Sequence, residues 1–272
     1  MPDKALEFIT KRRAFIISLL VAAVCWSLYY AWYLAGFPGN RIHVFAELDT
    51  GGLFRQKANG ISNFAFVIFG LIIAWDAGTR RYKPVSHSEN RMLRSDYYSG
   101  IYALAMVILG FGSLAMHGAL TSLGSFLDVS SMFIWVSYCV AYPLARIVRR
   151  GPVFFLVTYA VIATLLVYGL RERMLPGSGS QTFGALITLS VLWECGYRFM
   201  NRKRLRFDNK WVFFTALSFF TAFAIWNLSL DNRPFYNPNT IFQGHAVWHI
   251  LCAVSGWTIY KYYCSERLAE ES

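Results

Sequence analysis

The feature that most constrains this 272-residue chain is a series of eight apolar runs, each about 19–23 residues long. A helix of about 20 residues spans the ~30 Å hydrocarbon core of a bilayer. The runs are continuously apolar rather than alternating, which favours helices over the strands of a membrane barrel. They cover residues 14–36, 61–79, 97–118, 125–145, 152–170, 181–200, 211–230 and 243–263. The sequence therefore predicts an all-α integral membrane protein with eight spans.

The charged residues, 15% of the chain with a formal net charge of +11, are divided between the two ends of these runs. Twenty of the 26 basic residues fall in the two terminal tails and in every second loop, and six fall in the alternate loops. Because cytoplasmic loops are rich in Lys and Arg, both termini are predicted to be cytoplasmic. The positive charge is explained by topology, so no nucleic-acid partner is expected.

The first run follows the basic triplet Lys11-Arg12-Arg13, as a secretory signal would. Its 23 apolar-rich residues, 14–36, exceed the usual 7–15-residue signal core, and no Ala-x-Ala cleavage site follows. We therefore expect a retained anchor helix.

The last run opens with Gly244-His245-Ala246-Val247-Trp248-His249. Histidines four apart project from one face of a helix, one turn or about 5.4 Å from each other, which suits two ligands of one zinc ion. Residue 246 is alanine where soluble zinc proteases carry a glutamate, so a general base must come from elsewhere. The alternative is that two histidines at this spacing occur by chance and bind no metal.

Three more polar side chains share the membrane depth of this pair. His117 lies at the external end of run 97–118, and Asp128 lies about one turn inside run 125–145, after a short turn at residues 118–124. Ser113 lies one turn below His117 on the same helix face. Ionisable groups inside a membrane are costly and usually functional. We therefore expect a polar site in the external leaflet.

Other polar residues have ordinary structural explanations. Glu47 and Asp49, beside two glycines, are typical of a solvated turn. Asn59 and Ser62 are expected to cap the helix of the second run. Glu194 is expected to pair with Arg198, four residues farther along its helix.

The polar residues together resemble the alkaline ceramidases and the wider CREST superfamily of membrane hydrolases. The resemblance rests on Ser113-x-x-x-His117, on Asp128 eleven residues later, and on His245-x-x-x-His249. The stretch Asn59-Gly60-Ile61-Ser62-Asn63 also resembles the Asn-x-x-Ser-Asn sequence that opens the first core helix of the ceramidases. The resemblance extends from residue 47 to about residue 260.

This resemblance implies a seven-helix core, which leaves one additional helix at the N-terminus. Residues 1–40 would then form a cytoplasmic tail and an extra transmembrane helix. Residues 41–263 would form the ceramidase-like hydrolase core, and residues 264–272 a cytoplasmic tail.

The resemblance also implies that His117, His245 and His249 bind one zinc ion, with a water in the fourth position. Ser113 and Asp128 would be the catalytic neighbours of that water. Three neutral imidazoles and an open position lower the pKa of bound water toward about 7, and Asp128 can take and return its proton. The implied reaction is hydrolysis of the N-acyl bond of a ceramide-like lipid, on the non-cytoplasmic side of the membrane.

Eukaryotic ceramidases carry a calcium site in an acidic segment before the first core helix. Here that segment keeps Glu47 and Asp49 but has Gln56 near the position of a further acidic ligand. Calcium takes about six to eight oxygen ligands, so calcium is left unassigned.

Two other classes of function stay open. The progestin and adiponectin receptors share the serine, histidine and His-x-x-x-His elements, but their aspartate lies farther from the first histidine. A receptor would keep the metal structurally, with a fourth protein ligand closing the site. A transporter would place ionisable residues at the midplane and toward both faces, whereas these cluster on one side. The sequence assigns neither an acyl chain nor an oligomeric state.

Overall fold

The computed structural model describes residues 4–42, 47–80 and 90–269. It is 75% helical with almost no strand, as the apolar runs predict. Part of the expected cytoplasmic loop, at residues 81–89, lies outside the described residues. So do residues 1–3 and 270–272, the ends of the two predicted tails.

Within these described residues the chain forms ten helices and two short strands. The helices are α1 (Lys4–Leu34), α2 (Lys57–Ser62), α3 (Phe64–Arg80), α4 (Arg91–Arg94), α5 (Asp96–Ala119), α6 (Ser122–Ile147), α7 (Pro152–Arg171), α8 (Gly179–Met200), α9 (Asn209–Leu228) and α10 (Gly244–Cys264). The strands β1 (Leu205–Arg206) and β2 (Arg267–Leu268) pair antiparallel. Each predicted run coincides with one long helix, except that the second begins in α2 and continues in α3.

Six helical segments of the described chain are long and apolar enough to cross a membrane: α1, α2 with α3, α5, α6, α7 and α9. The remaining long helices, α8 and α10, have 22 and 21 residues and therefore reach about 30 Å. Both are more polar than the other six. The multi-pass all-α membrane fold is confirmed, and the count of eight crossings stays a prediction.

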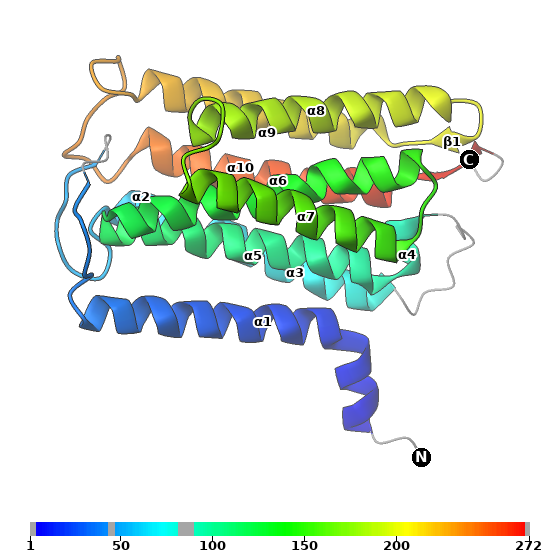
Figure 1. Cartoon of the computed structure of the whole chain (residues 1–272), viewed down its shortest axis with the longest axis horizontal. Helices are drawn as coiled ribbons and strands as arrows, with labels where there is room; N and C mark the ends of the chain where they lie inside the picture. The colour runs from blue at the N-terminus through cyan, green and yellow to red at the C-terminus, as the bar shows by residue number, and fades with distance from the viewer. Residues whose placement is uncertain (1–3, 43–46, 81–89, 270–272) are drawn as a thin grey trace.

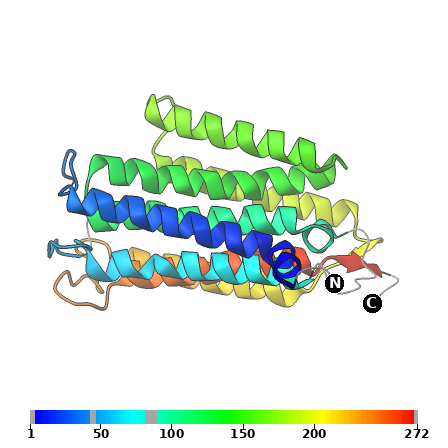
Figure 2. The same cartoon turned by 90° about the horizontal axis from the view of Figure 1, so that it is seen from below.

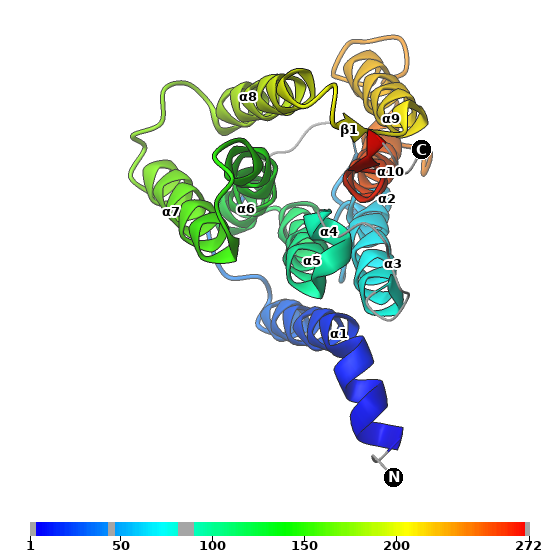
Figure 3. The same ribbon diagram turned by 90° about the vertical axis from the view of Figure 1, so that its right-hand side faces the viewer.

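The long helices run side by side in one bundle (Figures 1 and 2). Seen along the bundle in Figure 3, α5 lies near the middle, between α3 and α6, and α10 lies between α3 and α9. Helices α7 and α8 pack against α6, and α1 packs on the outside against α3 and α5. Helix α2 lies at one end of the bundle, and α4 and β1 lie at the other (Figure 1).

A cluster of fully buried tyrosines joins the central helices. Tyr102 of α5, Tyr138 of α6 and Tyr260 of α10 are inaccessible to solvent. The Tyr102 hydroxyl donates to the Gly256 carbonyl of α10 at 2.7 Å, so a buried polar atom has a partner. These contacts fix α10 against α5, the two helices that carry the histidines.

The connection between α5 and α6 is shorter than predicted. Helix α5 continues to Ala119 and α6 begins at Ser122, so the turn consists of Leu120 and Thr121 instead of residues 118–124. Leu120 adopts the left-handed conformation with φ of 51°, and the Thr121 hydroxyl caps α6 by accepting from the Gly124 amide. As a result Asp128 lies nearly two turns inside its helix rather than one.

Two glycines let α5 and α6 approach closely below this turn. A Cβ atom on Gly112 would lie 2.7 Å from the Leu127 carbonyl oxygen and would also contact Ser131. A Cβ atom on Gly124 would contact the Ala115 carbonyl. Since real Cβ atoms do not come so near, only glycine permits this crossing, which brings the Ser113 and Asp128 region of the two helices together.

The predicted ion pair of Glu194 is wrong. Glu194 pairs with Arg146 of α6 at 2.7 Å, and Arg198 donates instead to Asn209. Arg146 is 4% exposed and also contacts Glu266 at 2.5 Å, so one buried cation meets two carboxylates. Packing of α6 against α8 creates this pair, and a rule based on i, i+4 spacing does not detect it.

Candidate metal centre

Three histidines from two helices meet at the α2 end of the bundle. His117 lies in the last turn of α5, and His245 and His249 lie in the first two turns of α10. One ring nitrogen from each lies within 4.8 Å of the other two. His117 and His249 are buried, at 1% and 4% exposure, and His245 is half-buried. The structure therefore brings together the three residues predicted to bind a metal.

The His117 ring is held by Gln56. The Nε2 of Gln56 donates to the Glu47 carbonyl at 2.7 Å, so its Oε1 faces Nδ1 of His117, also at 2.7 Å. A carbonyl oxygen only accepts, which puts the proton on Nδ1 and leaves Nε2 of His117 with a free lone pair. The Gln56 backbone amide also donates to the His117 carbonyl at 3.0 Å. Gln56 thus fixes His117 at two points.

The His249 ring is held by Ser62 of α2. The Ser62 hydroxyl donates to the Asn59 carbonyl at 2.9 Å and lies 2.8 Å from Nδ1 of His249. A hydroxyl has one proton to donate, so toward the ring it accepts, and Nδ1 of His249 is the donor. Its Nε2 is then also free to bind a cation. Metal-binding histidines characteristically use their second nitrogen in this way.

Glu47, and not Asn59 or Ser62, caps α2, so that part of the sequence interpretation is wrong. The two Glu47 oxygens accept from the Ala58 and Asn59 amides, both at 2.9 Å. Asn59 and Ser62 lie inside the helix. Because the carboxylate satisfies amide groups that the helix leaves unpaired, it ties the preceding segment to the site.

The donor set fits a tetrahedral metal ion. Nε2 of His117 and Nε2 of His245 are 3.1 Å apart. In zinc sites with Zn–N bonds of 2.0–2.1 Å, ligand atoms are about 3.3 Å apart. Within the part of the chain that the structure describes, the cluster contains the three histidines and no carboxylate. Three imidazoles without a fourth protein ligand are the pattern of an open, catalytic site rather than a closed, structural one.

Ser113 and Asp128 lie on the two helices that cross at Gly112. Ser113 is 5% exposed, and its side chain lies near the half-buried Asp128 carboxyl. The crossing therefore brings together the two residues for which catalytic roles are predicted. Asp128 is outside the group of metal-binding atoms, so its carboxyl is available for other chemistry.

Comparison with known families agrees with this site. The sequence model of the family named Ceramidase matches residues 56–272, most of the chain. The chain belongs to the ceramidase family. No curated protein matches its sequence. Membership means that this ceramidase-family protein is a hydrolase acting on amide bonds, with a lipid as its substrate. The match begins at Gln56 and leaves α1 outside the ceramidase region.

Two residues that hold the ceramidase histidines were missed by the sequence interpretation. Gln56 was considered only as a replacement for an acidic residue, and Ser62 was considered as a cap and as part of a sequence resemblance, but neither was assigned to a histidine. The available signal was the concentration of polar residues, Gln56 to Asn63, at the start of an otherwise apolar run. In a membrane helix such residues need buried partners, and a histidine cluster at the same depth could supply them.

Proposed function

We propose that this protein is a zinc-dependent hydrolase that cleaves the N-acyl bond of a ceramide-like lipid. The observation that carries the proposal is the convergence of His117, His245 and His249, with two of the rings oriented by Gln56 and Ser62. These three histidines would hold the zinc ion. When bound, zinc polarises a carbonyl group and makes a water molecule acidic enough to attack it near neutral pH.

Asp128 and Ser113 would transfer the proton and stabilise the developing charge. Asp128 is the acid near Ser113 at the α5–α6 crossing, and as general base it would take the proton of the attacking water. It would then return the proton to the leaving amine. While Asp128 is ionised, the Ser113 hydroxyl would donate to the carboxylate, and once Asp128 has taken the proton, that hydroxyl would be free to donate to the oxygen that gains charge.

A lipid substrate could reach the site from within the membrane. The segment before α10 exposes large apolar side chains close in sequence to His245: Ile241 is 73% exposed and Phe242 is 88% exposed. Such side chains suit the membrane interface, where an N-acyl lipid places its amide group. The distribution of basic residues favours the non-cytoplasmic side for this end of the bundle, and the proposed site would open there.

The proposal is tested with the purified full-length chain and ceramide in mixed micelles. We expect release of fatty acid, loss of that release after treatment with a zinc chelator, and its recovery when zinc is added back. Elemental analysis should find about one zinc per chain, by the precedent of three-histidine sites. His249→Ala should lack both the metal and the activity. Fatty acid release that is unaffected by the chelator, or full zinc occupancy in His249→Ala, would contradict the mechanism.

A further inference from the structure

A basic cavity lies at the end of the bundle opposite the histidines. It has a volume of about 330 Å³ and lies between α4, the C-terminal ends of α6 and α8, and the segment that follows α10. Its charged lining consists of Arg91, Arg94, Arg146, Arg149, Arg204 and Glu266. Helix α10 separates it from His245 by about 30 Å, since 21 residues rise 1.5 Å each. The cavity is therefore a separate site from the proposed metal centre.

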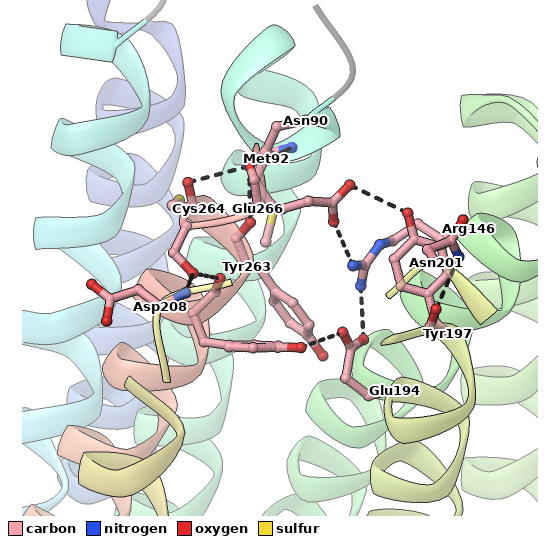
Figure 4. A network of polar contacts seen from close by, with 12 residues as sticks. Asn90, Met92, Arg146, Glu194, Tyr197, Asn201, Asp208, Tyr263, Cys264 and Glu266 are labelled. Carbon is pink, nitrogen blue, oxygen red and sulfur yellow. Dashed lines mark hydrogen bonds and ion pairs between the residues drawn. The ribbon is translucent and has the colours of Figure 1, made fainter. Parts of the chain in front are cut away.

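The floor of the cavity is a buried cluster of one cation and two carboxylates. Figure 4 shows the Arg146 guanidinium between the carboxylates of Glu194 and Glu266, at 2.7 and 2.5 Å. The Tyr197 hydroxyl also donates to Glu266, at 3.3 Å. The Glu266 carboxylate is thus already paired with Arg146 and Tyr197 within the floor. A buried pair with such partners holds the surrounding helices in place.

The rim of the cavity carries the excess positive charge. Arg94, Arg149 and Arg204 are exposed, and Arg91 is half-buried with one guanidinium nitrogen donating to the Arg150 carbonyl at 2.7 Å. Glu266 is the one acidic residue among the described residues that line the cavity. Four guanidinium groups gathered around one opening create a positive local potential, which attracts anions.

We propose that this cavity binds a phosphate-bearing anion, either the head group of an anionic membrane lipid or free phosphate. Guanidinium groups match phosphate oxygens with paired hydrogen bonds. Basic pockets between the ends of membrane helices are typical sites for anionic head groups. The C-terminal ends of α6 and α8 oppose an anion, but two helix ends act more weakly than four arginines. Asn201, which also lines the cavity, adds a polar side chain beside them.

The test uses two variants of equal charge. Arg149→Gln with Arg204→Gln removes two rim arginines, and Arg150→Gln with Arg202→Gln removes two exposed arginines that lie one and two residues away and do not line the cavity. The full-length protein in phosphatidylcholine nanodiscs is titrated with fluorescent phosphatidic acid. We expect the rim variant to bind about thirtyfold more weakly than the parent, and the control variant to bind as the parent does.

A second arm identifies the source of the anion. Inorganic phosphate is titrated into the same nanodiscs without phosphatidic acid, and thermal unfolding is measured. Stabilisation by phosphate that is lost only in the rim variant would support the site with a soluble anion as its ligand, whereas binding of phosphatidic acid alone would assign it to a lipid. Equal weakening in both variants would show general surface attraction and overturn the proposal. Failure of both probes to bind the parent would overturn it as well.

Discussion

Asp128 should affect the chemical step and leave the metal in place. It lies outside the three-histidine cluster, with the Ser113 side chain near its carboxyl. We predict that Asp128→Asn keeps about one zinc per chain but loses about 10²–10⁴-fold in turnover of an N-acyl lipid, the range for a positioned acid–base group. Ser113→Ala should lose less, because one hydrogen bond is removed and the carboxylate stays.

Turnover and zinc content, measured on the same preparation, check this prediction. Asp231→Asn is the matched control, since it makes the same chemical change in an exposed loop before α10 and should behave as the parent. Parental turnover by zinc-loaded Asp128→Asn would remove the general base from the mechanism. A different residue would then have to act as the general base.

Gln56 should set the affinity of the site for its metal. Its side chain and backbone both contact His117, and loss of a residue that orients a metal-binding histidine costs about 10–100-fold in affinity. We predict a loss of this size for Gln56→Leu, measured by competition with a fluorescent zinc chelator. Gln181→Leu is the control, because that carboxamide belongs to the capping box of α8. Equal zinc affinities in the two variants would show that Gln56 does not position the ligand.

At this scale the sequence predicted the histidines better than the residues that support them. Histidines inside apolar helices are rare, and a shared depth was enough to group His117 with His245 and His249. Ser62 gave no such signal, because a serine near a helix start has an ordinary explanation as a cap. Its contact with His249 depends on the packing of α2 against α10, which are 187 positions apart at these residues.

The long helices were predictable from the sequence for a different reason than the histidines were. An apolar run long enough to cross a bilayer must satisfy its own backbone, and a helix does so within the segment. Each of the eight runs therefore became a helix. The ends were less predictable: Thr121 and Leu120 form a tight turn whose left-handed residue is a leucine, where glycine is usual. The predicted turn at residues 118–124 was too long as a result.

The crossing of α5 and α6 supplies a prediction at the scale of elements. Gly112→Ala would place a methyl group against the Leu127 carbonyl and Ser131, so the two helices must separate. We expect a loss of about 1–3 kcal/mol in stability, as for other overpacked sites, and reduced turnover because Ser113 and Asp128 move apart.

Thermal unfolding in one detergent, together with an activity assay, measures both effects. Gly184→Ala in α8 is the control, since its Cβ atom would meet nothing within 4 Å and alanine favours a helix. An unfolding temperature for Gly112→Ala equal to that of the control would show that the crossing tolerates a larger residue.

Over the whole molecule, contacts between segments that are far apart in the sequence could not be predicted from the sequence. Glu194 was assigned a neighbour in its own helix, but its partner Arg146 lies 48 positions away. The charge distribution was informative at the same scale, because it depends on loops and not on contacts. It predicts that successive loops alternate between the two sides of the membrane, and this alternation depends on α8 and α10, the two more polar long helices.

Helix α8 gives the most direct test of that topology, because its two ends should face opposite sides. Single cysteines at Ser180 and Lys203, both exposed, are placed in a Cys195→Ala background to remove the exposed native thiol. The twenty basic residues that define the cytoplasmic segments include Lys203, and the segment before Ser180 belongs to the alternate set, which holds six. Because Lys and Arg are retained in the cytoplasm, a membrane-impermeant maleimide should label Lys203→Cys only from the cytoplasmic side of oriented vesicles. It should label Ser180→Cys only from the other side, and the background protein from neither. Labelling of both positions from one side would mean that α8 does not cross the bilayer, and the eight-span topology, with the metal centre on the external side, would be wrong.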